Sequence, residues 1–576
     1  MKHTRWQLET LYTIDDVKAG IATIQAALTK HPANVAKQVE RYQQVARDVE
    51  EWSDFIYCLY AEDVTRSEVH PLLEEIEIVQ AMVRSEAAAL DTKIAALSQE
   101  EWEELVTGSP YAFFLNERRD IQSRRAPLVQ EHLLQDLGVD GFQGWGQLYK
   151  QRFMALRVDL DNKQVTIGQG LHEAMFAPDR SARLSAATAV DTACAQEADL
   201  DLFATILNRI AGFRLQSYKM RNWEQPLTEL LEQNRISEAG LTAMMEALDQ
   251  HRDLFHAYYA RKIAQAERVT GEWHDFETNT YRSARHVPFE MAETIVTTQF
   301  KRLNPQLGAF AENVFSEGWV DAENRPGKAE GGFCAAFPIA KESRIFMTYR
   351  DSYPDVATLA HEFGHAYHNY LLQDEPYLNQ VKGTSIAETA STFMENLVLD
   401  AAIKETTERE EVLALLEVKI REGLKYASIV PGMFRFEQRF YAERQQGTVS
   451  AERLSELLQE EERLAYGPVL PEPARYKWMY ISHLFNPNLA FYNIPYTIGY
   501  LLSNSLYQTV QADPSQISTV FEAVMHDSGQ ATIDEIVKRH LDADPTSVAF
   551  WMEAQQPLVQ AIEQYLTLTE SSLSVD

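Results

Sequence analysis

Two histidines near the middle of the chain are separated by three residues, and a glutamate directly follows the first. The segment His361-Glu362-Phe363-Gly364-His365 matches the pattern H-E-x-x-H. In a helix, residues four apart lie on one face, so the two imidazoles can bind one metal ion. Glu362 lies beside them and can take a proton from a water molecule that the metal activates. The spacing therefore predicts metal-assisted hydrolysis, with His361 and His365 as zinc ligands and Glu362 as the general base.

The sequence around this motif predicts the helix that the chemistry needs. Ser352 is a candidate N-cap, and Pro354 is tolerated in a first helical turn. A short, apolar and β-prone segment at residues 344–350 precedes the helix and predicts a strand. The alternative is a chance match on a surface helix, which this context disfavours. Apolar residues recur at helical spacing on a face away from the histidines: Val356, Leu359, Ala360, Phe363, Ala366, Tyr367 and Tyr370.

A catalytic zinc site needs a third protein ligand and leaves its fourth position to water. His368 is about one turn beyond His365, but three ligands along one straight helix point in diverging directions. A carboxylate from a second helix fits tetrahedral geometry better, and Glu388 is the candidate. Ser385-x-x-Glu388 also matches a capping box, so spacing alone favours the two roles of Glu388 equally. Glu395, about two turns later, can either orient a ligand histidine or face solvent.

The composition is that of a folded, acidic protein. The chain has 576 residues, too many for one ordinary core, so two or more lobes are expected. The net charge of −32, without a basic block, argues against nucleic acid and against an anionic membrane surface as partners. The first residues lack a secretory signal, and no window approaches the roughly 18 apolar residues of a membrane span. Three cysteines without close spacing fit a reducing compartment, and the predicted location is the cytoplasm.

Most of the chain has the pattern of amphipathic helices. Between Glu74 and Leu97, apolar residues recur every three or four positions. Two glycine-rich breaks, at residues 138–146 and 318–338, are predicted to be turns and loops. Neither break has the strand–loop–helix pattern of a phosphate-binding motif.

Four segments of the chain carry a combined pattern that is far more specific than the zinc motif alone. They are Gly331-Gly332-Phe333-Cys334, Ile345-Phe346-Met347, Thr358 to His368 around the motif, and Ala387 to Glu395 around Glu388. Together they resemble the oligoendopeptidase F branch of the thimet-oligopeptidase family. The resemblance implies a mainly α fold, with two helical lobes around a deep substrate channel and a small β-sheet near the zinc site. It also implies one zinc ion per chain, Glu388 as the third ligand, and cleavage of internal bonds in oligopeptides.

We expect an N-terminal helical lobe over residues 1–195 and a catalytic zinc-peptidase region over residues 196–576. The resemblance further implies that a histidine and tyrosines from a late segment face the scissile carbonyl. Here His483 and Tyr496 are the preferred matches, followed by Tyr492, with Tyr500 as a further option.

The substrate peptide is predicted to add as a strand to residues 344–350. Two other activities stay open at this stage. A zinc exopeptidase would need a site for a free terminus, and a non-catalytic peptide-binding protein would not need the intact Glu362. Nothing in the sequence specifies an oligomeric state.

Overall fold

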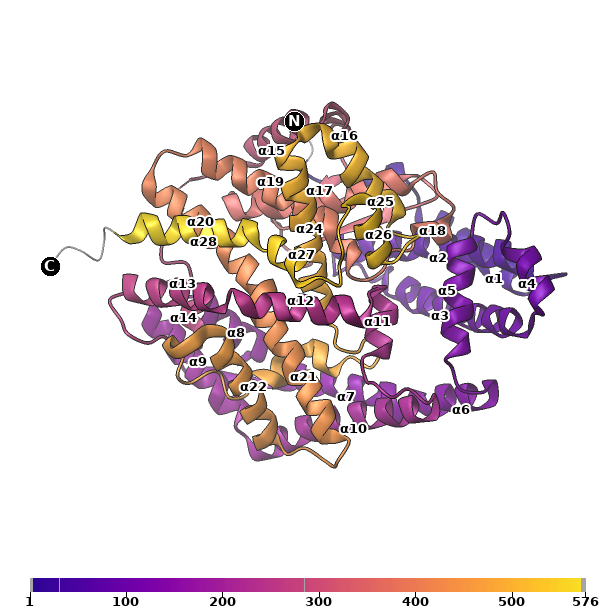
Figure 1. The fold of residues 1–576 in the computed structure, drawn as a ribbon, viewed down its shortest axis with the longest axis horizontal. Helices are drawn as coiled ribbons and strands as arrows, with labels where there is room; N and C mark the ends of the chain where they lie inside the picture. The colour runs from indigo at the N-terminus through magenta and orange to yellow at the C-terminus, as the bar shows by residue number, and fades with distance from the viewer. Residues whose placement is uncertain (1–3, 31, 284, 571–576) are drawn as a thin grey trace. The chain divides into compact units, whose positions relative to one another are not determined.

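The computed structural model describes residues 4–30, 32–283 and 285–570. The chain is mainly helical, with small sheets, as the sequence predicts (Figure 1). It divides into two compact units, each built from three segments. Unit 1 comprises residues 1–123, 284–405 and 502–544, and unit 2 comprises residues 124–283, 406–501 and 545–576. The sequence predicts a single division of the chain, after residue 195, and that N-terminal lobe stays a prediction.

Unit 1 contains fifteen of the described α-helices and strands, and three of these fifteen are the strands of one sheet. Its elements are α1 (Ile14–Leu28), α2 (Val35–Glu62), α3 (His70–Ala96), α4 (Gln99–Val106), α5 (Ala112–Ser123), α15 (Phe289–Leu303), α16 (Pro305–Ser316), β3 (Val320–Asp321), β4 (Gly332–Phe337), β5 (Glu342–Met347), α17 (Tyr353–Leu372), α18 (Tyr377–Gln380), α19 (Thr389–Glu405), α25 (Ala523–Asp527) and α26 (Ile533–His540).

Unit 2 is built from helices and one two-stranded hairpin. Its elements are α6 (Leu128–Gly138), α7 (Gly144–Ala155), β1 (Arg157–Leu160), β2 (Lys163–Thr166), α8 (Ile167–Phe176), α9 (Arg180–Cys194), α10 (Glu197–Met220), α11 (Thr228–Asn234), α12 (Glu238–Gln250), α13 (Arg252–Gln265), α14 (Trp273–Glu277), α20 (Arg409–Leu424), α21 (Val430–Arg444), α22 (Ala451–Tyr466), α23 (Lys477–Tyr480), α27 (Val548–Glu553) and α28 (Gln556–Glu570). The remaining helix, α24 (Ile494–Ala512), contributes residues to both units.

The glycine-rich breaks differ from the prediction of turns and loops. Residues 139–143 form a π-helix that continues into α7, so the first break is helical. The second break contains β3 and all of β4. Glycine and small residues hide the alternation that marks a strand, and β4 is held by its neighbours rather than by its own β-propensity.

The sheet of unit 1 has the strand order β3-β5-β4. Strand β5 pairs in parallel with β3 and antiparallel with β4, where Cys334 faces Ile345. The strand predicted at residues 344–350 is therefore present over Glu342–Met347, but it is the central strand. β4 pairs with β5 along its whole length, and β3 pairs with Ile345 and Phe346 on the other side, so β5 is not an edge strand to which a peptide could add. The prediction that this segment binds the peptide is wrong.

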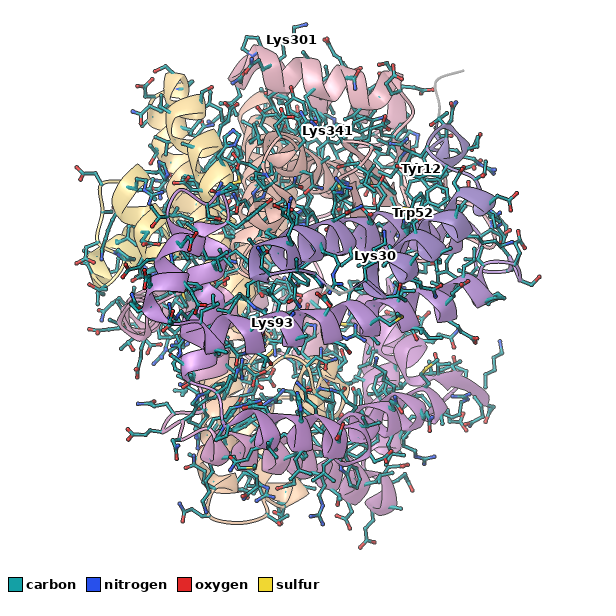
Figure 2. All side chains as sticks on the ribbon, turned by 90° about the vertical axis from the view of Figure 1, so that its right-hand side faces the viewer. Tyr12, Lys30, Trp52, Lys93, Lys301 and Lys341 are labelled. Carbon is teal, nitrogen blue, oxygen red and sulfur yellow. The ribbon has the colours of Figure 1, made fainter. Side chains whose placement is uncertain are left out.

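Helix α2 supports the outer side of β4. The Asp54 carboxylate accepts a hydrogen bond from the Ala336 backbone N–H at 2.8 Å, and Glu51 accepts one from Ile339 N–H at 2.7 Å. Figure 2 labels Tyr12 and Trp52, whose ring centroids are 4.7 Å apart where the start of the chain packs against α2. The N-terminal helices of unit 1 therefore hold the sheet in place.

The motif helix α17 begins as the sequence predicts. Ser352 is its N-cap, with Asp355 completing a capping box and a proline in the first turn. Helices α17 and α19 pack against each other in unit 1 (Figure 1). Gly364 permits this approach, because a Cβ atom there would lie 2.5 Å from both Ala390 O and Ser391 Cα. The glycine inside the motif therefore sets how closely the second helix approaches the histidines.

Among the helices of the described residues, none is long and apolar enough to cross a membrane.

Candidate metal centre

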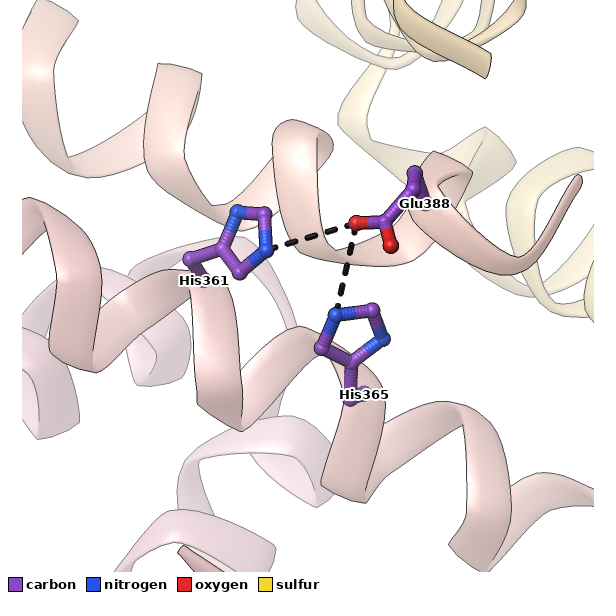
Figure 3. A group of neighbouring side chains, drawn as sticks. All are labelled: His361, His365 and Glu388. Atoms are coloured by element: carbon purple, nitrogen blue, oxygen red, sulfur yellow. Dashed lines mark ion pairs between the residues drawn. The ribbon is translucent and has the colours of Figure 1, made fainter. Parts of the chain in front are cut away.

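Three side chains meet between α17 and the start of α19. The Glu388 Oε2 atom lies 3.4 Å from the Nε2 atoms of both His361 and His365 (Figure 3). One ligand atom from each residue lies within 4.8 Å of the other two. Metal–ligand bonds of about 2.0–2.1 Å in tetrahedral geometry separate ligand atoms by about 3.3–3.4 Å. The residues therefore fit a zinc ion, with His361, His365 and Glu388 as its ligands.

Glu388 reaches this position from a short 3₁₀ turn, Ile386–Glu388, that leads into α19. Ser385 makes no side-chain cap hydrogen bond at this turn, so the capping box is not formed. Instead, Ser391 Oγ donates to the backbone oxygen of Glu388 at 2.8 Å and to its Oε2 at 3.0 Å. Burial would raise the pKa of Glu388, but the two histidines hold this pKa far below its usual range.

His368, the alternative third ligand, faces away from this group. Its ring is 1% exposed, and Nε2 contacts Ser528 Oγ at 2.8 Å and Met525 O at 3.3 Å. Ser528 Oγ uses its one proton to bond Met525 O, so the Nε2 atom of His368 must donate to Ser528 Oγ. His368 therefore packs α17 against α25, as a buried structural residue.

Glu395 lies on the opposite side of the His361 ring from Glu388. Its Oε2 is 3.4 Å from Nδ1 of His361. A carboxylate only accepts hydrogen bonds, so this contact places the proton on Nδ1 and leaves Nε2 free to bind a metal. Burial opposes charge on His361, yet Glu388 and Glu395 raise the pKa of His361 to about 10. The centre thus strongly attracts positive charge.

Glu362 is the neighbouring residue with the features of a general base. It is 5% exposed, and its Oε2 has no hydrogen-bond partner among the described residues. Burial raises the pKa of Glu362. A Cβ atom at Gly332 on β4 would lie 3.2 Å from Glu362 Oε1, so the strand passes directly beside this carboxyl group. An unpaired, buried carboxyl beside the metal ligands can hold and release a proton.

The late segment forms a cluster within unit 2. The His483 ring is 5.0 Å from Tyr492 and 6.1 Å from Tyr496, measured between centroids, and the two tyrosines are 5.8 Å apart. Tyr500 differs, because it is buried and its hydroxyl packs against Gly423. The hydroxyl oxygen is 2.7 Å from the position that a Cβ atom on Gly423 would take. Tyr500 is therefore a core residue. The approach of His483, Tyr492 and Tyr496 to the metal ligands stays a prediction.

A residue that the sequence pattern did not single out, Asn493, contacts the His483 ring. Asn493 Oδ1 lies 2.8 Å from Nδ1 of His483. The same amide lies beside the buried Glu437 carboxyl, whose pKa burial raises to about 8 against the opposing effects of Arg214, Phe491 N–H and Asn493. Asn493 lies in the sequence between Tyr492 and Tyr496, and the family pattern points only to the tyrosines of this segment as oxyanion donors beside His483. An amide in the same segment is a signal that could have identified it.

Comparison with known proteins agrees with this geometry. The family model described as peptidase family M3 matches residues 174–555. The oligoendopeptidase F homolog of Lactococcus lactis is 24% identical over 344 residues, which cover 57% of this chain and 55% of that protein. Oligopeptidase PepF of Bacillus subtilis is 22% identical over 333 residues, covering 56% of this chain and 49% of that protein. The chain thus spans about half the length of these curated relatives.

Solved structures share the fold over nearly the whole chain. A protein of Chlamydophila abortus, described as a peptidase, has a TM-score of 0.82 at 17% identity and covers 98% of both chains. Oligoendopeptidase F of Enterococcus faecium has a TM-score of 0.70 at 17% identity, covering 97% of this chain and all of its own. These likenesses concern the fold, whereas the family model covers well over half of the sequence, including the three candidate metal ligands. The chain belongs to peptidase family M3.

Proposed function

We propose that this protein is a zinc-dependent endopeptidase that hydrolyses internal peptide bonds of short oligopeptides. The observation that carries the proposal is the convergence of His361, His365 and Glu388 at zinc-ligand spacing, with the unpaired Glu362 carboxyl beside them. The names of the relatives, oligoendopeptidase and oligopeptidase, support a short peptide as the substrate.

The residues of this chain have separate tasks in the proposed reaction. A bound zinc ion would polarise the peptide carbonyl and lower the pKa of a water molecule. Glu362 takes a proton from the attacking water and delivers it to the leaving amine nitrogen. Burial raises the pKa of Glu362, which suits a group that must both accept and return a proton. Glu395 holds the His361 ring in the required orientation.

Strand β4 offers the edge that β5 lacks. The Ala336 N–H points away from β5, toward Asp54. Because backbone groups alternate along a strand, those of Gly332 and Cys334 also face away from β5. An extended peptide could pair with them, and Gly332 lies against the Glu362 carboxyl. We therefore place the substrate along β4, next to the proposed base.

His483 and Tyr496 are proposed to stabilise the oxyanion, with Tyr492 as the alternative donor. Asn493 accepts from Nδ1–H of His483, which leaves Nε2 as the nitrogen available to substrate.

The decisive experiment uses a peptide of about ten residues that is blocked at both ends. The protein is expected to cut it internally, to lose activity to a chelator and to regain activity with zinc. Glu362→Gln is expected to retain zinc and lose hydrolysis, because the ligands survive while the base is lost. Strict dependence on a free terminus would instead assign an exopeptidase, and near-normal turnover by zinc-loaded Glu362→Gln would rule out the proposed base.

A further inference from the structure

The face of α17 that carries the two ligand histidines continues for another turn. His361, His365 and Asn369 are spaced four residues apart, so they follow one another along the same face. Each step of four residues advances about 6 Å along the helix. Asn369 therefore lies about 6 Å beyond His365 along the helix axis.

The segment that supplies the third ligand also contacts Asn369. Lys382 precedes Glu388 by six residues, and its Nζ donates to Asn369 Oδ1 at 2.9 Å. Asn369 Nδ2 donates to Ser343 Oγ on β5 at 3.3 Å, which fixes the amide with its oxygen toward the lysine. Residues 382–388 thus cross the ligand face, with Glu388 over the two histidines and Lys382 over Asn369.

The Lys382 ammonium group is incompletely neutralised. The residue is partly buried, and Asn369 is its single hydrogen-bond partner among the described residues, although an ammonium group has three donors. Burial lowers the pKa of Lys382, and Glu50 is the carboxylate that opposes this effect. Glu50 in turn accepts a hydrogen bond from Tyr377 OH. A buried cation with a neutral partner favours a further anionic one.

Lys382 also borders the proposed path of the peptide. Lys382 contacts Asn369, Asn369 donates to Ser343 Oγ, and Ser343 pairs with Ala336 on β4, two residues beyond Cys334. The outward backbone groups at Gly332 and Cys334 therefore run from the proposed base toward the lysine. An extended peptide advances about 3.3–3.6 Å per residue, so about 6 Å corresponds to about two residues from the reacting bond.

We propose that Lys382 is a substrate-binding residue that recognises a peptide carboxylate about two residues from the scissile bond. The carboxylate can belong to an Asp or Glu side chain or to the free C-terminus of a short peptide. The proposal rests on the proposed endopeptidase function and adds a preference for acidic substrates, despite the net charge of −32. If Lys382 only balances Glu50, it will not discriminate among peptides.

The test compares cleavage of matched peptides by the zinc-loaded protein. A neutral parent peptide, blocked at both ends, is varied by placing Glu, and separately Gln, at each of three positions on either side of the scissile bond. A second pair of peptides carries either a free C-terminal carboxylate or an amide. Lys382→Met removes the charge, and Lys382→Arg retains it. Lys301→Met, at an exposed lysine of the same unit, is the control for net charge.

The expected result is a higher kcat/KM for one Glu position, or for the free acid, than for its neutral counterpart. A charge-assisted hydrogen bond corresponds to about a tenfold to a hundredfold preference. Lys382→Met should abolish this preference through KM and spare the neutral peptide, whereas Lys382→Arg and Lys301→Met should retain it. A preference for Glu at one position identifies a side-chain carboxylate as the group that Lys382 binds. A preference for the free acid identifies the C-terminal carboxylate.

Direct binding separates this proposal from the proposed function. Dissociation constants for the same peptides are measured in the Glu362→Gln background, with and without Lys382→Met, by fluorescence anisotropy. Weaker binding of the acidic peptide alone in the double variant supports the lysine subsite even if turnover fails. An equal effect of Lys382→Met on acidic and neutral peptides, or no acidic preference in the parent protein, overturns it. If Lys382→Met does not fold, Lys382→Gln, which also removes the charge, takes its place: loss of the acidic preference supports the subsite, and retention overturns it.

Discussion

The close contact between α17 and α19 predicts that Gly364→Ala lowers both the stability and the zinc affinity of the protein. The added Cβ atom would lie 2.5 Å from Ala390 O and from Ser391 Cα, both of which are backbone atoms that cannot rotate away. Ordinary contact begins near 3.4 Å, so the helices must separate by about 0.9 Å. Overpacking of this kind costs about 1–3 kcal/mol in the free energy of unfolding. Because Glu388 directly precedes α19, the same shift carries this proposed third ligand away from His361 and His365.

Urea unfolding measures the loss of stability, and the zinc content after dialysis against a weak chelator measures the loss of metal affinity. A shift near 1 Å is well beyond the roughly 0.2 Å tolerance of a metal site, so zinc retention should fall sharply. Gly168→Ala is the matched control, because a Cβ atom on α8 would meet no atom within 4 Å. Its stability should be equal or slightly higher. A Gly364→Ala protein with normal stability and full zinc content would refute the reasoning.

Three further predictions follow from the site. Glu388→Ala should lose zinc on dialysis, whereas loss of a mere cap would cost only about 0.5–2 kcal/mol of stability and leave the zinc content unchanged. Tyr496→Phe should lower kcat about 10²–10³-fold with little change in zinc content, while Tyr500→Phe, in the core, should leave kcat near normal; equal effects of both would contradict the assignment. Burial raises the pKa of Glu437 to about 8 in the folded state, whereas its pKa in the unfolded chain is near 4.5. The unfolded chain therefore loses this proton at lower pH than the folded protein does. The free energy of unfolding should fall as pH rises from 4.5 to about 8, by about 5 kcal/mol at most. Glu437→Gln should remove that slope, and urea unfolding at pH 5, 6.5 and 8 will show whether it does.

Local patterns predicted much of the motif helix. Ser352 and the proline of the first turn identify where α17 begins, and the four-residue spacing places both histidines on one face. The mainly helical fold also follows from apolar periodicity, as in α3. These features depend on residues within a few turns of each other, which is the range over which sequence patterns report structure directly.

Long-range contacts account for what the sequence left open or mispredicted. Spacing could not decide between a cap and a ligand for Glu388, because the answer depends on how closely α19 approaches Gly364. The central place of β5 depends on β3, which is two residues long and carries no pattern of its own. Strand β4 is supported by carboxylates of α2, some 280 residues earlier in the chain. None of these contacts leaves a periodic signal.

The support of β4 by α2 has a consequence for dissecting the protein. The family match begins at residue 174, and a fragment that started there would cut through unit 2. Such a fragment would contain the three candidate metal ligands but would lack Glu51 and Asp54, the carboxylates that hold the outer side of β4. It would leave the N–H groups of Ala336 and Ile339 without their partners and so extend the open edge of β4, and exposed edges promote aggregation. The first helices of the chain therefore cover part of the edge of the strand that lies next to Glu362.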